Sequence, residues 1–374
     1  MRTWNAAGGP GSPQQGACQA VGDFGLQQEE QRADEEVHRR RNLACALAPS
    51  PSAVDNRSFV QPATPLPGTQ DLLFEAANRL RRCEATLCGR FEDKGYAEVI
   101  PPAIEAADVF GPEAFRALDR SGRLIALRSD FTAQVARIAA TRLAGMSPLR
   151  LYYRGSIVRR VAPDSGPVHE RLQAGCELVG AAGPEADAEI LALAASSLHA
   201  LGIRGRISLG STGYFSALAT AAGASERLAA SLNDAVDRKD LPTLRTLCER
   251  EVAPGKARDA ILLLAQPPRP QTEARELLAR AEALAPSEEA LQALRRISAA
   301  LAAARSLGAE LEVDLGEVRG LGYYTGIVFN LYAMGSPRPV GGGGRYDTLL
   351  GRFGDPRPAV GFSLDLDALV PLAC

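Results

Sequence analysis

The sequence is poor in the residues that build metal centres and disulfide frameworks. Its 374 residues contain three histidines, His38, His169 and His199, which lie far apart, and seven cysteines that form no CxxC pair. Structural zinc sites and disulfide-rich scaffolds both need such residues at short, regular spacings. We therefore expect neither a metal nor any other cofactor.

Long apolar runs and an excess of charge are missing as well. No stretch approaches the roughly 18 to 20 apolar residues of a membrane-spanning helix, and the N-terminus lacks the basic-then-apolar order of a signal peptide. The formal net charge is -2, with 42 basic and 44 acidic residues, which gives no positive field to attract a nucleic-acid backbone. These absences predict a cytoplasmic protein without affinity for membranes or nucleic acid.

What is present is enough to bury a sizeable core, since 46% of the residues are hydrophobic. Residues 1–60 differ from the rest: they are rich in Gly, Gln, Ser and Pro, and they carry an acidic patch followed by three arginines. This composition predicts a disordered N-terminal extension. We expect residues 61–374 to form the folded domain.

Helical and extended patterns share this folded part. Apolar residues over 73–91 recur at spacings of three and four, which predicts an amphipathic helix that ends near Gly95. Residues 222–307 are rich in Ala, Leu, Arg and Glu with helical periodicity, which predicts an all-helical insert with Gly308 as its C-terminal cap. Strands are expected at 97–100, 149–160, 206–211, 311–315, 323–333 and 359–364. Their grouping on both sides of the insert favours an α+β fold with an antiparallel or mixed sheet.

The first candidate site lies in residues 127–132, LRSDFT. Asp130 and Thr132 are two residues apart at an expected strand-to-helix junction, where a carboxylate and a hydroxyl on one side could bind an ammonium group together. An aspartate at such a junction is also typical of a helix N-cap. The pattern by itself favours the cap.

The second candidate site follows the segment YYRGSIVRR and lies in HERLQAGCE. Gln173, Gly175 and Glu177 alternate along an expected strand and share one face, which would line a surface with an amide and a carboxylate and leave a glycine gap for a ligand. A plain antiparallel hairpin with a solvated polar face fits the same pattern equally well.

The third candidate site combines VRGLGYYTG with GGGGRYD. Four consecutive glycines permit close approach of the backbone to a ligand or to a neighbouring strand, although such a run is also typical of a flexible hairpin loop. The sequence contains no GxxxxGK[ST], so the run is not a P-loop.

Taken together and in this order, these segments resemble the catalytic core of class II histidyl-tRNA synthetases over residues 65–369, apart from the helical insert. Residues 150–180 resemble motif 2, RGLGYYTG resembles the RGLDYY signature that contacts histidine, and GFSLDLDAL resembles motif 3. The resemblance implies a class II synthetase-like sheet flanked by helices, and it places Arg159 where the motif 2 arginine meets the ATP α-phosphate. The histidine-binding residues that it implies are Asp130, Thr132, Gln173, Glu177, Arg319, Tyr323 and Tyr324.

Departures from the synthetase pattern concern its nucleotide and tRNA chemistry. The motif 3 arginine that clamps ATP phosphates is replaced by Ala368, so no cation stands there to stabilise charge at phosphorus. Val161 replaces the glutamate that follows the motif 2 arginine, and Gly322 replaces the aspartate of RGLDYY. The sequence ends at Cys374 directly after motif 3, which predicts no anticodon-binding domain. We therefore expect no aminoacylation, and we interpret Arg159 as vestigial.

The phrases GYYTGIVFNLYA, GGGGRYDTLLGRFG and PAVGFSLDLDAL resemble the regulatory subunits of short-form ATP phosphoribosyltransferase. This resemblance implies a dimer of the class II type that joins a separate catalytic subunit in a hetero-octamer for the first step of L-histidine biosynthesis. The partner would convert ATP and phosphoribosyl pyrophosphate to phosphoribosyl-ATP and pyrophosphate. The chain would be required for full activity and for feedback inhibition by histidine.

Two alternatives stay open at this point. A truncated synthetase paralogue could still form histidyl-adenylate, although Ala368 argues against it, and a histidine sensor with another partner would carry the same residues. Regulatory histidine could bind the inherited pocket or the interface with the catalytic subunit. Burying Glu177 without a partner would cost on the order of 1 to 3 kcal/mol, which favours a retained ligand contact.

Overall fold

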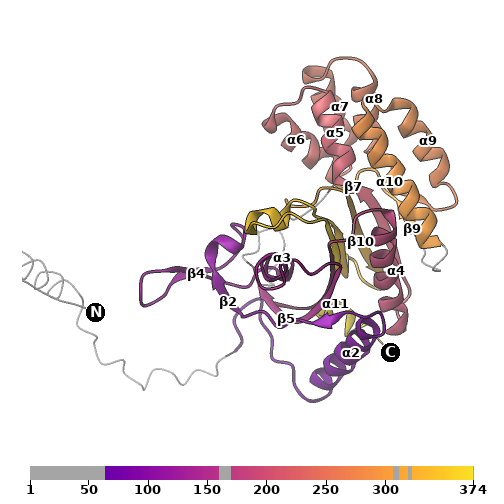
Figure 1. Cartoon of the computed structure of the whole chain (residues 1–374). Coiled ribbons are helices and arrows are strands. Elements are labelled where there is room, and N and C mark those ends of the chain that lie inside the picture. The colour runs from indigo at the N-terminus through magenta and orange to yellow at the C-terminus, as the bar shows by residue number, and fades with distance from the viewer. Residues whose placement is uncertain (1–63, 160–169, 306–310, 319–321, 374) are drawn as a thin grey trace, which may run out of the picture. The chain divides into compact units, whose positions relative to one another are not determined.

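A mixed β-sheet carries most of the residues that the sequence singles out. The computed structural model describes residues 64–159, 170–305, 311–318 and 322–373 (Figure 1). Within them nine strands form this sheet, in the order β1-β5-β6-β12-β11-β10-β7-β9-β8. The pairs β1–β5 and β7–β9 are parallel, and the other neighbours are antiparallel. The predicted mixed sheet is confirmed, whereas the extension predicted for residues 1–60 lies outside the described residues.

The strands of this sheet are β1 (Ala97–Glu98), β5 (Leu149–Val158), β6 (Glu170–Val179), β7 (Gly205–Ser211), β8 (Arg269–Pro270), β9 (Leu311–Val313), β10 (Ile327–Ala333), β11 (Gly341–Arg345) and β12 (Ala359–Asp365). A separate antiparallel sheet has the order β2-β4-β3, with β2 (Ile104–Ala106), β3 (Arg116–Leu118) and β4 (Leu124–Leu127). The strand-to-helix junction expected at Asp130 implies β4, whereas β2 and β3 were not predicted. Their chain leads directly into the first candidate site.

Helices cover the two faces of the large sheet. The helices outside the insert are α2 (Phe74–Glu92), α3 (Phe131–Thr141), α4 (Pro184–Ala200), α5 (Thr212–Ala221) and α11 (Leu366–Leu369), with 3₁₀ turns η1 (Ala107–Val109) and η3 (Leu349–Phe353). The predicted helix over 73–91 is confirmed as α2, and it packs on α4 and on β5 and β6. Strand β5 shows why both faces are covered: Tyr152 lies in the core beneath α2 and α4, and Tyr153 lies in the core beneath α3. Successive side chains of a strand point to opposite faces.

The insert is helical with one exception. Its helices are α6 (Glu226–Asp237), α7 (Leu241–Glu251), α8 (Lys256–Leu263), α9 (Ala274–Leu284) and α10 (Glu288–Arg305), which stand beside one another in Figure 1. The expectation of an all-helical insert was wrong at β8, which pairs with β9. The prolines around this strand break helical hydrogen bonding, and proline is tolerated at a sheet edge because it has no N–H to donate. The C-cap predicted at Gly308 lies outside the described residues.

The glycine run forms strand β11 in the middle of the sheet, between β10 and β12. Of the two possibilities left open by the sequence, close approach to a neighbouring strand is therefore confirmed and the loop is wrong. A Cβ on Gly343 would lie 2.7 Å from Cβ of Phe362 and 2.8 Å from Cζ of Phe329. Such distances are far inside van der Waals contact, so only glycine fits between these strands.

Candidate functional site

Asp130 is the residue directly before helix α3, and it is buried. Its side chain accepts a hydrogen bond from the backbone N–H of Thr132 at 3.0 Å, so the predicted N-cap is confirmed. The other carboxylate oxygen accepts from the Tyr323 hydroxyl at 3.0 Å, across 193 residues of sequence. Burial raises the pKa of Asp130, and the guanidinium of Arg159 and the hydrogen bonds oppose this shift. The N-cap residue thus also contacts a tyrosine from the C-terminal part of the chain.

Glu177 on β6 is the centre of the site, and hydroxyl groups surround it. The Thr132 hydroxyl donates to Oε1 at 2.7 Å, the Tyr346 hydroxyl donates to Oε2 at 2.5 Å, and the Tyr153 hydroxyl lies 3.3 Å from Oε1. Only 1% of Glu177 is exposed. Burial raises the pKa of Glu177 to about 8, because desolvation of the carboxylate outweighs the hydroxyl hydrogen bonds. This carboxyl group can therefore hold or release a proton near neutral pH.

Tyrosine rings form the wall around this carboxyl. The centroids of Tyr323 and Tyr324 are 5.1 Å apart, and those of Tyr323 and Tyr346 are 5.8 Å apart, both in edge-to-face geometry. Tyr153 stacks on Phe131 with 4.3 Å between the centroids. Burial raises the pKa of each of the four tyrosines above its ordinary value, so their hydroxyls remain protonated donors.

The segment that supplies Tyr323 and Tyr324 is not part of a strand, although a strand was predicted from residue 323. Strand β10 begins at Ile327, and the preceding turn contains Gly322 with φ +71°. The Tyr324 ring lies against the next strand, because a Cβ on Gly344 would be 2.9 Å from Cδ1 of that ring. Glycine in β11 thus makes room for a tyrosine of the site as well as for the adjoining strands.

The structure brings together most of the residues implied by the resemblance, with two exceptions. Asp130, Thr132, Glu177, Tyr323 and Tyr324 lie in one cluster of hydrogen-bonded and packed side chains, whereas Arg319 lies outside the described residues. Arg159 is near this cluster, and its Nε donates to the Ser129 carbonyl at 2.7 Å.

Gln173 is placed differently from this group. Its amide donates to Asp365 on β12 at 2.7 Å. The predicted ligand gap at Gly175 was wrong, because a Cβ there would meet the Tyr153 hydroxyl at 2.5 Å. The Tyr153 side chain fills that space, because the β5–β6 register pairs Tyr153 with Gly175. A role for Gln173 in ligand binding stays a prediction.

The motif reasoning missed two members of the site, Tyr153 and Tyr346. Both stand in quoted segments, YYRG and GGGGRYD, but nothing in those letters shows that their hydroxyls meet one carboxyl. Tyr153 pairs in register with Gly175, diagonally across the β5–β6 ladder from Glu177, and Tyr346 follows β11. The available signal was the alternation of β5, which puts Tyr153 on the face of Leu151, the residue paired with Glu177.

The position of the synthetase phosphate clamp carries no cation. Ala368 lies on α11 and packs against the main hydrophobic core. Its neighbour Asp367 accepts hydrogen bonds from the Leu172 backbone at 2.6 Å and from the Gln70 amide at 2.8 Å. The Asp367 carboxylate is therefore held by contacts within the chain.

The described part of the chain has neither a cluster of metal ligands nor a membrane-spanning helix. Within it, no three side chains of His, Cys, Asp or Glu are placed to hold a metal ion. None of the helices described is both long and apolar enough to cross a bilayer. The described cysteines Cys83, Cys88, Cys176 and Cys248 are buried as free thiols.

Comparisons with known proteins identify the family of the chain. The family model described as "Histidyl-tRNA synthetase" matches residues 68–369. The ATP phosphoribosyltransferase regulatory subunit of Geobacter sulfurreducens is 38% identical over 320 residues, which cover 82% of this chain and 72% of the relative. The subunit of the same name from Anaeromyxobacter dehalogenans is 39% identical over 313 residues, which cover 80% of this chain and 88% of the relative.

Among solved structures, an ATP phosphoribosyltransferase regulatory subunit/histidyl-tRNA synthetase from Bacillus halodurans superposes with a TM-score of 0.75 at 27% identity, covering 83% of each chain. The class II synthetase-like α+β fold predicted from the motifs is thereby confirmed. The chain belongs to the family of ATP phosphoribosyltransferase regulatory subunits and has the fold of histidyl-tRNA synthetase.

Proposed function

We propose that this chain regulates a short-form ATP phosphoribosyltransferase catalytic subunit, in the first step of L-histidine biosynthesis, by binding L-histidine among the side chains around Glu177, which form the proposed pocket. The observation that carries the proposal is the buried carboxyl whose pKa is raised to about 8 among protonated hydroxyl groups. An unperturbed imidazole has a pKa of about 6.5. The protonated carboxyl can donate a hydrogen bond to a neutral imidazole nitrogen, and the carboxylate can pair with an imidazolium.

The second carboxyl supports the same ligand. Asp130 and Glu177 are joined through Thr132, whose backbone N–H bonds one carboxyl and whose hydroxyl bonds the other. Two carboxyl groups at one place suit a ligand with two basic nitrogens, and the ring of tyrosines suits the flat face of an imidazole. Free histidine has both features, with its ammonium group and its side chain.

We infer further that the chain does not aminoacylate tRNA. In a class II active site the motif 3 arginine would stabilise the negative charge that develops on the α-phosphate, and the partly buried Ala368 packs against the core instead. The catalytic work would fall to the partner subunit. We propose that the chain forms a class II-type dimer, which joins the catalytic subunit in a hetero-octamer in the cytoplasm. Residues 61–374 would form the folded domain, with residues 222–307 as its insert.

The test is an ATP phosphoribosyltransferase assay of a short catalytic subunit, with and without this chain, each titrated with L-histidine. We expect the chain to raise the activity and histidine to inhibit only the mixture. Glu177→Ala should leave activation intact and weaken inhibition by more than tenfold, because the variant lacks the group proposed to meet the imidazole. Activation that fails at every ratio of the two proteins would contradict the regulatory role.

A second assay separates this proposal from a synthetase paralogue that forms histidyl-adenylate. Histidine-dependent exchange between ATP and pyrophosphate would be measured on the isolated chain. We expect none, because adenylate formation needs the missing phosphate clamp. Exchange above the level of a no-histidine control would favour the paralogue.

A further inference from the structure

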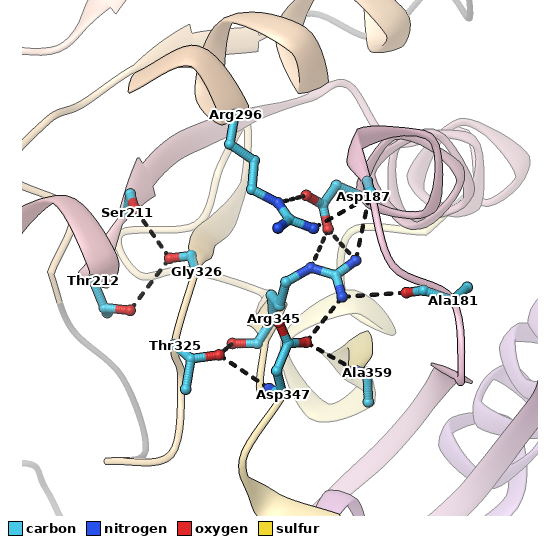
Figure 2. Close-up of polar contacts among 11 residues, drawn as sticks. Ala181, Asp187, Ser211, Thr212, Arg296, Thr325, Gly326, Arg345, Asp347 and Ala359 are labelled. Atoms are coloured by element: carbon cyan, nitrogen blue, oxygen red, sulfur yellow. Dashed lines mark hydrogen bonds and ion pairs between the residues drawn. The ribbon is translucent and has the colours of Figure 1, made fainter. Parts of the chain in front are cut away.

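A buried ion-pair network connects the helical insert to the pocket. Asp187, in the first turn of α4, is fully buried and lies between two guanidinium groups (Figure 2). Its Oδ1 accepts from Arg345 Nε at 2.8 Å and pairs with Arg345 Nη2 at 2.6 Å, and its Oδ2 accepts from Arg296 Nε at 2.7 Å. Arg345 belongs to β11, and Arg296 belongs to α10, the last helix of the insert. One carboxylate therefore joins three elements.

The network balances its own charge. Arg345, with 1% of its side chain exposed, also pairs with Asp347 at 3.0 Å, so two cations face two carboxylates. Its remaining donors reach the carbonyl oxygens of Ala181 and Gly183, which precede α4. A charge so deeply buried is stable only while its partners keep their positions. The direction of the Arg345 side chain is thereby fixed from the α4 side.

Hydrogen bonds connect Arg345 and Asp347 to the segment that contains Tyr324. The carbonyl of Arg345 accepts the N–H of Thr325 at 2.7 Å, and the Thr325 hydroxyl accepts the N–H of Asp347 at 3.0 Å. Thr325 directly follows Tyr324, and Tyr346 stands between Arg345 and Asp347. Two segments that supply tyrosines to the pocket are therefore clamped to each other at the residue that the network holds.

We propose that Arg296 is a positioning residue through which the helical insert sets the place of Tyr324 and Tyr346 in the pocket. The proposal rests on the function proposed above for the identity of the ligand, but not for the coupling itself. Arg296 touches none of the pocket residues named here, and its side chain is 30% exposed. A movement of α10 would withdraw one of the two cations from Asp187 and let that carboxylate turn, which shifts Arg345. Whatever holds or moves the insert would then adjust the pocket.

The experiment uses the full chain and compares Arg296→Met with Arg296→Lys. Methionine keeps the apolar stem and removes the charge, whereas lysine keeps the charge. Arg295→Met is the matched control, because Arg295 precedes Arg296 on α10, is 63% exposed and pairs only with Glu288 among the described residues. Backbone hydrogen exchange would be followed at residues 323–326 and 345–347, with β7 as the internal reference. Histidine affinity would be measured by calorimetry on the same samples.

We expect Arg296→Met to speed exchange at both segments by about fivefold and to weaken histidine binding by a similar factor, in the range found when coupled residues are altered. Lysine should restore most of both effects, and Arg295→Met should change neither. Unchanged exchange in Arg296→Met, or the same change in Arg295→Met, would overturn the coupling. If histidine binds the unaltered chain and Glu177→Ala equally well, the proposed binding site fails, and exchange still decides the coupling.

Discussion

The proton equilibrium of Glu177 gives the sharpest test of the site. Burial raises the pKa of Glu177 from 4.5 to about 8 in the folded chain. Between these values the folded state binds more protons than the unfolded state, so this group makes the free energy of unfolding fall as pH rises. Its contribution is most favourable below about pH 4.5, declines through the window up to about pH 8, and is constant above it. The full change corresponds to about 5 kcal/mol, since one pKa unit is worth about 1.4 kcal/mol.

The perturbation is Glu177→Gln, which keeps the shape of the side chain and removes its titration. Urea unfolding of both proteins at several pH values would give the difference in stability between them. We expect the original chain to lose about 4 kcal/mol relative to the variant between about pH 5 and pH 9, because only the glutamate must ionise in the core. Groups that titrate in both proteins, such as Asp130, largely cancel in the difference.

Glu288→Gln supplies the control, since it makes the same chemical change at a side chain that is 57% exposed on the insert. Because this carboxylate stays in contact with water, we expect no comparable divergence of the two stability profiles. Parallel pH profiles for the original chain and Glu177→Gln would refute the reasoning. That outcome would mean that water or a rearranged hydroxyl solvates the carboxylate in the folded protein.

Three further outcomes are expected. Arg345→Met should lower the free energy of unfolding by about 3 kcal/mol, because it leaves buried carboxylates without one of their cations; a loss below about 1 kcal/mol in urea unfolding would contradict this. Gly361→Ala should destabilise by about 3 kcal/mol, since a Cβ there would collide with the Glu177 carboxyl, whereas Gly89→Ala, in open space on a helix, should stabilise by about 0.5 to 1 kcal/mol; thermal unfolding compares the two. Tyr346→Phe should raise the pKa of Glu177 further, because a hydrogen bond that favours the carboxylate is lost. In a plot of the free energy of unfolding against pH, the decline due to Glu177 should then end at a higher pH; an end at a lower pH would argue against this.

Local patterns in the sequence determined the elements and the family. The spacing of apolar residues over 73–91 fixed helix α2, and Asp130 at a strand-to-helix junction was enough to predict the N-cap. The order of LRSDFT, HERLQAGCE and GGGGRYD identified the synthetase-like fold. These features depend on residues a few positions apart, whose effect on the backbone is the same in most folds.

Only the tertiary structure decided which groups meet. Glu177 accepts hydrogen bonds from Thr132, 45 residues before it, and from Tyr346, 169 residues after it. The glycine run became a central strand, and Gln173 turned to Asp365, because the register of β11 and β6 against β12 sets those neighbours. Local periodicity carries no information about such long-range pairing. The sequence therefore specified the parts and the ancestry of the pocket, while the packing of distant strands set its protonation and its connection to the insert.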